Sequence, residues 1–247
     1  MSVPPRIFDP ARRRSAAERA LAIAARKGAD AFLLEDMAED VLERIDFMQL
    51  DAGRALVIGA ELTGLSASLR AAGWQVDVPD PLGFDEEHPW GESYDLVVNL
   101  GRLDRINDLP GALLHMRHAL SEGGIAIAAI LGAGSLPRLR EAMLAADGER
   151  PAARLHPMID SGSATALMQR AGFRRQVVDS HTMEVRYATL DRLVADLRAH
   201  SFGNQLVSRP PALTRESRAR AGDTFAAAAR DGKTTEIFEL LTLTGWG

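Results

Sequence analysis

The chain of 247 residues contains no cysteine, which excludes disulfide bonds, thiolate nucleophiles and cysteine-bound metals. No apolar run approaches the length of a membrane-spanning helix, and the opening segment, MSVPPRIFDPARRR, lacks the apolar stretch of a secretory signal. The formal net charge of −5 leaves no basic excess of the kind that nucleic-acid binding needs. These absences predict a soluble bacterial cytoplasmic protein whose main partner is not nucleic acid.

The residues that are present alternate between strand and helix patterns, and the hydrophobic content of 46% suffices for one large core. Strands are expected at 54–59, 74–78, 94–100, 125–131, 173–179, 182–187 and 234–243. Helices are expected at 11–27, 30–47, 62–72, 108–120, 135–146, 161–171, 189–200 and 214–230. This alternation predicts an α/β fold with a parallel sheet. We expect N-terminal helices in residues 1–50 that pack on one α/β domain of residues 51–247, with a helical insertion near the C-terminus.

The turn after the first strand marks the candidate site, because a sheet of this kind usually binds its cofactor there. Leu56, Val57 and Ile58 form a buried-strand run that Gly59 ends. Glycine allows the backbone to turn sharply and to approach a ligand without a Cβ in the way. Glu61 stands where a further glycine is expected, so the side chains of this turn decide what can bind.

Two later segments carry a family resemblance. The strand Tyr94-Asp95-Leu96-Val97-Val98 and the turn Ala119-Leu120-Ser121-Glu122-Gly123-Gly124 resemble the central strand and the Gly-Gly turn of class I S-adenosylmethionine-dependent methyltransferases. A narrower likeness extends over nearly the whole chain and lies in Ile7-Phe8-Asp9, Arg12-Arg13-Arg14, Ile106-Asn107-Asp108-Leu109-Pro110, Arg170-Ala171-Gly172-Phe173 and Leu243-Thr244-Gly245-Trp246. In these segments the chain is similar to the group that contains the methyltransferase-like assembly factor of respiratory complex I and the malonyl-carrier-protein methyltransferase of biotin synthesis.

This resemblance implies a Rossmann-like fold, S-adenosylmethionine as the cofactor and, from the assembly factor, a respiratory-chain subunit as a protein partner. The mitochondrial assembly factor is thought to hydroxylate an arginine of a complex I subunit, so the fold alone does not imply methyl transfer.

The sequence departs from the family at the cofactor motif, which reads acid-x-Gly-x-Gly-x-Gly. Val57 takes the place of the acid, while Glu61 and Thr63 take the places of the last two glycines. The Glu61 side chain occupies the space of the methionine part of the cofactor. Its carboxylate would repel the cofactor's carboxylate unless it turned to the ammonium or the sulfonium. The first glycine of the motif survives as Gly59.

If the cofactor binds, the residues expected to hold it are Gly59, Ala60, Glu61, Asp80 and Asn99. Asp80, with Asp77 as the second choice, would take the ribose hydroxyls, although a solvated loop aspartate is the simpler interpretation of both. No metal site is predicted.

The segment between the second and third strands is short for this family, which normally fits a helix, a further strand and an acidic residue near the adenine there. Residues 81–93 supply 13 positions, broken by two prolines and two glycines, whereas a crossover with its helix needs at least about 10–12 residues and the extra strand needs more. We expect this helix and edge strand to be missing. In the family's numbering, the sheet would then run 2-1-4-5-7-6 without strand 3.

Other sites fit the sequence less well. Gly59 and Gly64 have P-loop spacing, but Leu65 stands where the phosphate-binding lysine belongs, and no middle glycine supports a dinucleotide site. His115 and His118 share a helix face without a third ligand in evidence, so a surface pair is the simpler interpretation.

Charged segments near the candidate site are also open to two interpretations. Asp85-Glu86-Glu87-His88 could chelate a cation but reads equally as a charged loop tip, and Arg12-Arg13-Arg14 could bind an anion or begin a solvated helix. The family's His-Trp pair is replaced by Asp104 and Arg105, which changes the chemistry at the site end of the sheet. These departures favour a non-catalytic binding or assembly module. The alternatives are an active methyltransferase with an altered pocket and, more weakly, a protein hydroxylase, for which no two-His-one-carboxylate metal site can be found.

Overall fold

The computed structural model describes residues 6–27, 31–91 and 93–247. The strands are β1 (Arg54–Ile58), β2 (Gln75–Asp77), β3 (Tyr94–Leu100), β4 (Leu120–Leu131), β5 (Arg174–Tyr187) and β6 (Thr234–Trp246). The α-helices are α1 (Pro10–Lys27), α2 (Phe32–Phe47), α3 (Leu65–Ala71), α4 (Leu109–His118), α5 (Pro137–Asp147), α6 (Ser161–Arg170), α7 (Leu190–Ala199) and α8 (Arg215–Ala227). A short 3₁₀ helix, η1 (Leu103–Arg105), follows β3.

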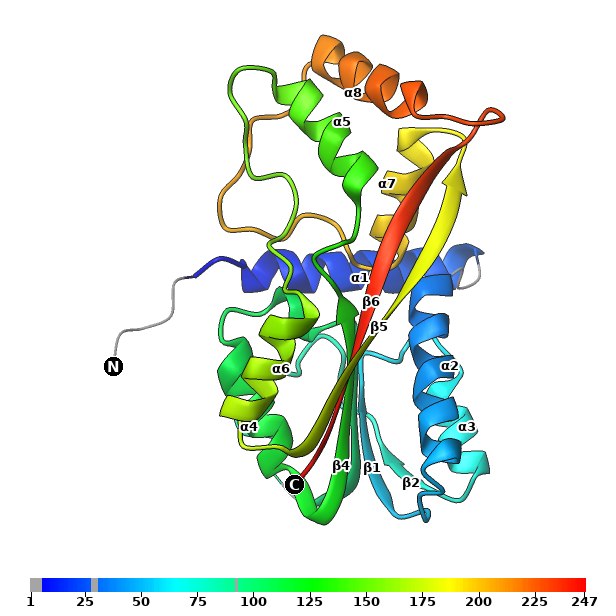
Figure 1. Ribbon diagram of the computed structural model, residues 1–247, viewed down its shortest axis with the longest axis vertical. Helices are drawn as coiled ribbons and strands as arrows, with labels where there is room; N and C mark the ends of the chain where they lie inside the picture. The colour runs from blue at the N-terminus through cyan, green and yellow to red at the C-terminus, as the bar shows by residue number, and fades with distance from the viewer. Residues whose placement is uncertain (1–5, 28–30, 92) are drawn as a thin grey trace.

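The six strands form one mixed sheet in the order β2-β1-β3-β4-β6-β5. The pairs among β1, β2, β3 and β4 are parallel, and β6 is antiparallel to both of its neighbours. Helices α2 and α3 cover one face of the sheet, and α4 and α6 cover the other (Figure 1). Because both faces are covered, β1 and β3 are almost entirely buried and read as continuous apolar runs. The predicted α/β alternation is confirmed, but the prediction of a parallel sheet was wrong for β6, which pairs antiparallel with β4 and β5.

The paired strands β5 and β6 extend beyond the other strands at one end of the sheet (Figure 1). Helices α7 and α8 lie between these two strands in the chain, and together with α5 they gather at this extended end. The N-terminal side of α5 is held by Glu236 of β6, whose carboxylate accepts hydrogen bonds from the backbone N–H groups of Arg138 and Leu139 at 3.1 and 2.8 Å. This end of the molecule is therefore built on the C-terminal strand.

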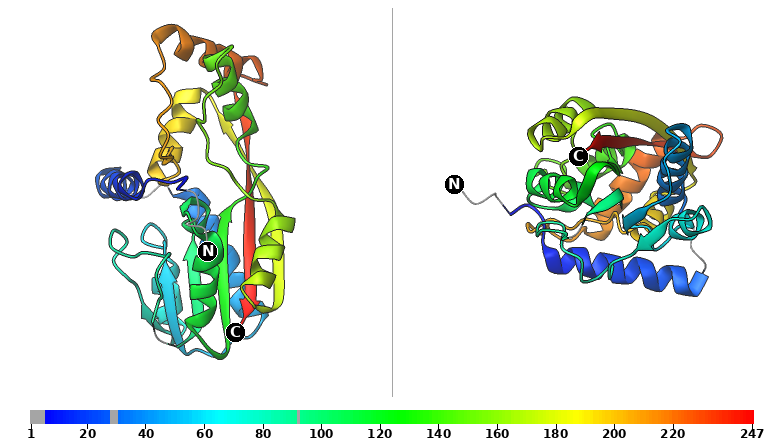
Figure 2. Two further views of the ribbon diagram at one scale, coloured as in Figure 1. Left: turned by 90° about the vertical axis from the view of Figure 1, so that its left-hand side faces the viewer. Right: turned by 90° about the horizontal axis from the view of Figure 1, so that it is seen from below.

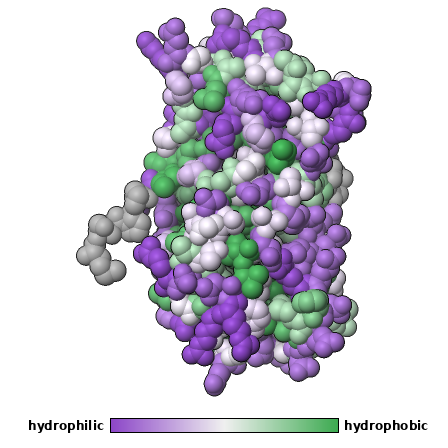
Figure 3. Space-filling model, in the orientation of Figure 1, coloured by the Kyte–Doolittle hydropathy of each residue, from purple (hydrophilic) through white to green (hydrophobic). Residues whose placement is uncertain are grey.

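Helix α1 crosses the carboxyl edge of the parallel strands, nearly at right angles to them (Figure 2). The segment before it is fastened to two loops. The Asn107 side chain accepts hydrogen bonds from the N–H groups of Ile7 and Phe8, both at 2.8 Å. Phe8 also forms a β-bridge with Leu206. On the face shown in Figure 3, hydrophobic atoms are scattered among hydrophilic ones rather than gathered in one large patch.

Most boundaries agree with the sequence to within a few residues, and two differ for a clear physical reason. Two strands were expected at 173–179 and 182–187, but β5 is continuous, since an edge strand tolerates polar residues such as Ser180 and His181 while it pairs with β6. Residues 121–124 were expected to form a turn before a strand at 125–131, but they belong to β4 as an irregularity in its pairing with β3. The predicted helix start at residue 30 and the predicted helix end at Gly28 lie outside the described residues.

Residues 79–91 and 93 form turns and irregular backbone without helix or strand. In the described part of the chain, none of the helices combines the length and the apolar character that crossing a bilayer requires.

Candidate functional site

A cavity of about 490 Å³ lies at the carboxyl ends of β1 and β3, against α1. Helix α1 contributes apolar side chains that include Ala17 and Leu21. The turn after β1 contributes Gly59 and Glu61, and the loop after β2 contributes residues 81–85. This volume is typical of pockets for small molecules, and the position is the one at which sheets of this kind bind ligands.

Position 59 requires a glycine for two reasons, its backbone conformation and its close neighbours. Its φ of +82° is a conformation that side chains rarely adopt. A Cβ on Gly59 would overlap the carbonyl oxygen of Leu100 and would lie 3.0 Å from Cδ of Arg102. The next residue, Ala60, is buried and accepts a hydrogen bond from the N–H of Thr63 at 3.0 Å. The side chain of Arg102 therefore lies directly against the turn after β1.

Thr63 and Glu61, which replace glycines of the family motif, have different surroundings. The Thr63 hydroxyl donates to the carbonyl of Ala60 at 3.1 Å and accepts from the N–H of Leu65 at 3.3 Å, so it closes the turn that begins α3. Glu61 faces the cavity, and its Oε1 atom is buried without a hydrogen-bond partner among the described residues. Glu61 is therefore the side chain of this turn with unused hydrogen-bonding capacity.

The other two candidate residues lie away from the cavity. Asp80 is exposed, and its carboxylate accepts a hydrogen bond from the N–H of Leu82 at 3.1 Å in the turn after β2. Asn99 is fully buried near the end of β3, and neither polar atom of its side chain has a partner among the described residues. Because strand side chains alternate, Asn99 points to the face opposite that of Val98 and Leu100. Leu100 lines the cavity, whereas Asn99 does not.

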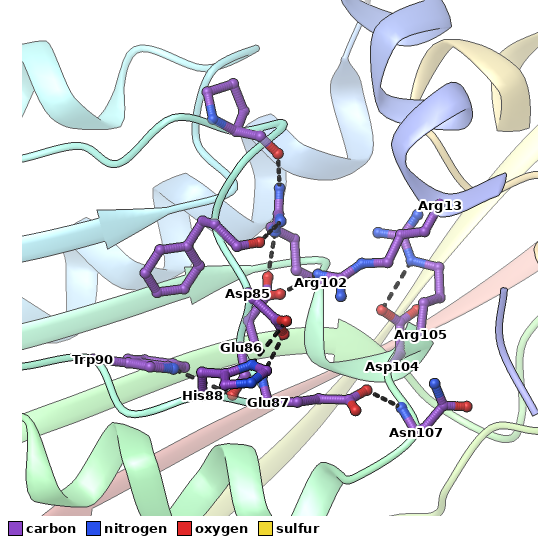
Figure 4. A network of polar contacts seen from close by, with 12 residues as sticks. Arg13, Asp85, Glu86, Glu87, His88, Trp90, Arg102, Asp104, Arg105 and Asn107 are labelled. Atoms are coloured by element: carbon purple, nitrogen blue, oxygen red, sulfur yellow. Dashed lines mark hydrogen bonds and ion pairs between the residues drawn. The ribbon is translucent and has the colours of Figure 1, made fainter. Parts of the chain in front are cut away.

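A buried carboxylate joins three parts of the molecule beside the cavity (Figure 4). Glu86, in the loop after β2, is fully buried and forms ion pairs with Arg13 of α1 and with Arg102, which follows β3. Burial alone would raise the pKa of Glu86, but the two guanidinium groups hold it below its usual value. The Glu86 carboxylate therefore fastens α1 and the loop to the end of β3.

The guanidinium of Arg102 uses all three of its nitrogens in this network. Nε donates to Glu86, Nη1 donates to the carbonyl of Pro81 at 2.9 Å, and Nη2 donates to the carbonyl of Phe84 at 3.4 Å. These contacts hold the arginine across the mouth of the turn at Gly59. The fixed position of Arg102 follows from the loop carbonyls as much as from the charge of Glu86.

Asp104 and Arg105, which replace the family's aromatic pair, form a buried ion pair at 3.2 Å. Burial lowers the pKa of Arg105, and Asp104 opposes this shift. The guanidinium also donates to the carbonyl of Ser201 and lies over the ring of Phe202, 4.6 Å from its centroid. Arg105 therefore connects η1 to the loop after α7.

At the acidic tip of the loop after β2, the side chains of Asp85, Glu87 and His88 already have hydrogen-bond partners. His88 Nδ1 lies 2.9 Å from Asp85, and Glu87 accepts a hydrogen bond from the N–H of Asn107 at 2.6 Å. The described residues contain no cluster of three or more histidine, aspartate or glutamate side chains that could hold a metal ion.

A second cavity of about 220 Å³ lies near the far end of the molecule, lined mainly by apolar side chains of α5 and α7 and by His156. His156 Nε2 accepts a hydrogen bond from the N–H of Gln205 at 2.8 Å. Burial, together with the positive charge of Arg105, lowers the pKa of His156 to about 4. His156 is thus a neutral acceptor that helps to order the loop after α7.

Sequence reasoning missed Glu86 and Arg102 as a pair. Glu86 looked like one of several acids in an exposed loop, and its burial depends on how the loop folds over β3. The one available signal was Arg102, a charged residue placed just after a buried strand, where the carboxyl edge of the sheet lies.

Comparison with known sequences gives this geometry a context. A family model described as a methyltransferase domain matches residues 19–178. The mitochondrial arginine-hydroxylase NDUFAF5 of Homo sapiens is 30% identical over 169 residues, which is 66% of this chain and 49% of that protein. The mouse protein of the same name is 28% identical over 180 residues, or 70% and 52%. This chain therefore spans about half the length of these relatives.

Another relative aligns over more of its length. The malonyl-[acyl-carrier protein] O-methyltransferase of a Methylovorus strain is 26% identical over 271 residues, covering 97% of this chain and 90% of that protein.

Solved structures share the fold at low identity. The 1,6-didemethyltoxoflavin-N1-methyltransferase of Burkholderia thailandensis, solved with S-adenosylhomocysteine bound, superposes with a TM-score of 0.53 at 13% identity over 99% of this chain and 92% of its own. The YcgJ protein of Bacillus subtilis has a TM-score of 0.51 at 10% identity, over 84% and 97%. At such identities, the likeness shows the architecture and nothing of the chemistry.

Proposed function

Because this chain belongs to the methyltransferase-domain family, we propose that it keeps the family's Rossmann-like fold as a non-catalytic binding or assembly module. The observation that carries this proposal is the position of Arg102 against Gly59. The family's cofactor approaches the backbone at this turn, and here a fixed cation stands in its way. S-adenosylmethionine brings a sulfonium cation of its own, so its entry would require Arg102, a partly buried arginine that donates from all three of its nitrogens, to leave Glu86.

The remaining candidate residues also fit the cofactor poorly. The Glu61 side chain faces the space where the methionine part of S-adenosylmethionine would lie. The carboxylate of Asp80 accepts a hydrogen bond from the N–H of Leu82 within its own turn. Asn99 points to the other face of the sheet. Gly59 and Ala60 keep the shape of the turn, which the fold itself needs. S-adenosylmethionine therefore does not fit these residues in the family's manner, and no reaction step is assigned to it.

We also propose that residues 79–93 stand in for the helix and edge strand that the family places there. The order β2-β1-β3-β4-β6-β5 corresponds to 2-1-4-5-7-6 in the family's numbering, and the irregular backbone of this segment supports the same conclusion. One wall of the adenine pocket would then be absent. Residues 51–247 would form one α/β domain, with residues 1–50 packed on it through α1 and α2.

The partner we propose is a protein subunit of the respiratory chain. Two observations support it: the resemblance to the complex I assembly group, and relatives that carry the name arginine-hydroxylase NDUFAF5. A fold that has lost its cofactor can still present its loops to a protein. The carboxyl edge, covered by α1, is where those loops gather.

A second candidate, an active methyltransferase with an altered pocket, is favoured by one observation. The cavity of about 490 Å³ persists at the place where the family binds its cofactor. Such an enzyme would have to hold S-adenosylmethionine beside Arg102 rather than against the turn.

Isothermal titration of the full chain with S-adenosylmethionine and S-adenosylhomocysteine distinguishes these candidates. We expect no binding at about 1 mM ligand, which corresponds to a binding free energy weaker than about −4 kcal/mol. Micromolar binding would refute the closed site and favour the enzyme. The double substitution Glu61→Gly, Thr63→Gly should not restore micromolar affinity, because Arg102 and the shortened loop remain. Restored affinity would show that the turn alone is the defect.

A further inference from the structure

The cavity beside Gly59 contains one carboxylate oxygen that the described residues leave without a partner. Oε1 of Glu61 is buried and has no hydrogen-bond partner there. A buried acceptor left in this state is destabilising, and more so when the group is charged. Such a group in a cavity of ligand size points to a donor supplied from outside the chain.

The arginines that line the same cavity make their printed contacts to other acceptors, and none of them hydrogen-bonds Oε1 of Glu61. Arg102 donates from all three nitrogens to Glu86 and to two loop carbonyls. Arg13 is paired with the same Glu86, and Arg14 lies 3.2 Å from Glu18. Arg105 is paired with Asp104 and donates to a carbonyl. Each of these arginines therefore has a carboxylate partner other than Glu61, while Oε1 of Glu61 has no partner among the described residues.

Apart from the arginines, Glu61 and the polar residues Asp85, Glu87, Asn107, His200 and Ser201, the cavity wall is apolar. Ala17 and Leu21 of α1, Leu34 of α2 and Leu62 line it together with Glu61. A ligand that fills this space needs an apolar body and one positively charged donor. A carboxylate on the ligand would be repelled by Glu61.

We propose that this cavity binds an organic amine, a primary ammonium group on an apolar stem of several carbons, with the ammonium on Glu61. The ammonium is preferred to a guanidinium because a single oxygen is buried and unpartnered, and a point donor matches it better than a planar fork does. The inference rests on the proposed function in one respect: the cavity is free for such a ligand because S-adenosylmethionine does not occupy it.

The test is an NMR titration of the ¹⁵N-labelled full chain with hexylamine, with hexanol and hexanoate as neutral and anionic probes of the same length. We expect hexylamine to bind with a Kd below about 1 mM and to shift the amide signals of residues 59–62, while hexanol and hexanoate bind at least about tenfold more weakly. Glu61→Gln keeps the size of the side chain and should weaken hexylamine binding about tenfold or more, as the loss of a charge-assisted hydrogen bond predicts.

Glu122→Gln is the matched control, because it removes one carboxylate from an exposed position on a different strand, β4. It should leave the affinity unchanged. The proposal is overturned if hexylamine fails to bind at about 10 mM, if hexanol binds equally well, or if Glu61→Gln has no effect. The spectrum of each variant shows whether it is folded. Butylguanidine as an added probe separates the donor types, and tighter binding of butylguanidine than of hexylamine would overturn the choice of an ammonium.

S-adenosylmethionine in the same titration keeps the two proposals distinguishable. If it binds, and Glu61→Gln does not weaken it, the closed cofactor site is refuted while the amine result stands by itself. If hexylamine fails and S-adenosylmethionine also fails, the amine site is refuted and the non-catalytic proposal remains.

Discussion

Gly59 carries two constraints that separate substitutions can distinguish. Its positive φ excludes most side chains, and its contact with the backbone of Leu100 excludes even a methyl group. The first constraint costs about 1–3 kcal/mol by itself, and the second requires β1 and β3 to move apart. Both constraints belong to the fold, so they would persist in a chain that binds no cofactor.

We expect Gly59→Ala to lower the free energy of unfolding by about 3 kcal/mol or more, because strain and steric overlap add. Gly123→Ala is the control, since Gly123 has a φ of +79° and nothing within 4 Å of a Cβ. It should cost about 1 kcal/mol through the backbone alone. Urea unfolding of both variants measures the difference. Equal losses in the free energy of unfolding would show that the backbone relieves the overlap with Leu100 without destabilising the protein.

Sequence reasoning could locate Gly59, because the end of a buried strand followed by glycine is a local pattern. The N-cap of α4 is a local feature of the same kind: Asp108 directly precedes the helix, and its carboxylate accepts from the N–H of Gly111 at 2.9 Å. Sequence reasoning could not find the partners of Glu86, which come from residues 73 and 16 positions away in the chain. Contacts over such separations depend on how the loop folds, and no local pattern encodes that.

Helix α1 is held on the sheet by polar contacts at its N-terminal end rather than by a wide apolar face. Its residues are mostly exposed or half-buried, with Ala16 and Ala20 among the few that are buried. The ion pair of Arg13 with Glu86 and the anchoring of Phe8 by Asn107 therefore carry much of its attachment. The sequence predicted the helix from its composition, but it gave no signal for the surface that the helix covers.

We expect Glu86→Gln to loosen α1 and to destabilise the protein by less than the cost of about 3–5 kcal/mol for a fully buried pair, because it leaves two partly buried guanidinium groups without an anion. Hydrogen exchange measures the local effect: amides of residues 13–26 should exchange faster than those of β3. Glu18→Gln is the control, since Glu18 pairs with Arg14 on the exposed side of the same helix. It should change exchange little. Unchanged protection in Glu86→Gln would mean that the ion pair does not hold the helix.

At the scale of the whole molecule, the loop after α7 connects the two ends of the structure. It meets the N-terminal segment through Phe8, the site loops through Arg105, and the second cavity through His156. His156 also lies edge-on against Phe8, with ring centroids 5.3 Å apart. The protonation of one buried imidazole therefore affects contacts that hold both ends together.

We expect stability to fall in mild acid because of His156. Its pKa is about 4 in the folded protein and about 6.5 in the unfolded chain, so the unfolded chain takes up the proton first as the pH falls. The stabilising contribution is complete above pH 6.5 and is lost as the pH drops toward 4. The loss between pH 7 and pH 5 should be about 2 kcal/mol.

Urea unfolding at several pH values between 7 and 5 measures this slope. The window lies above the unfolded pKa of glutamate, so the depressed pKa of Glu86 adds little to the change there. In His156→Gln the side-chain amide oxygen can still accept from Gln205, while the titrating group is gone. This variant should be less stable than the original protein at pH 7 but should lose much less stability by pH 5. If stability falls equally with pH in the two proteins, other groups cause the acid sensitivity. The claim that burial lowers the pKa of His156 would then be refuted.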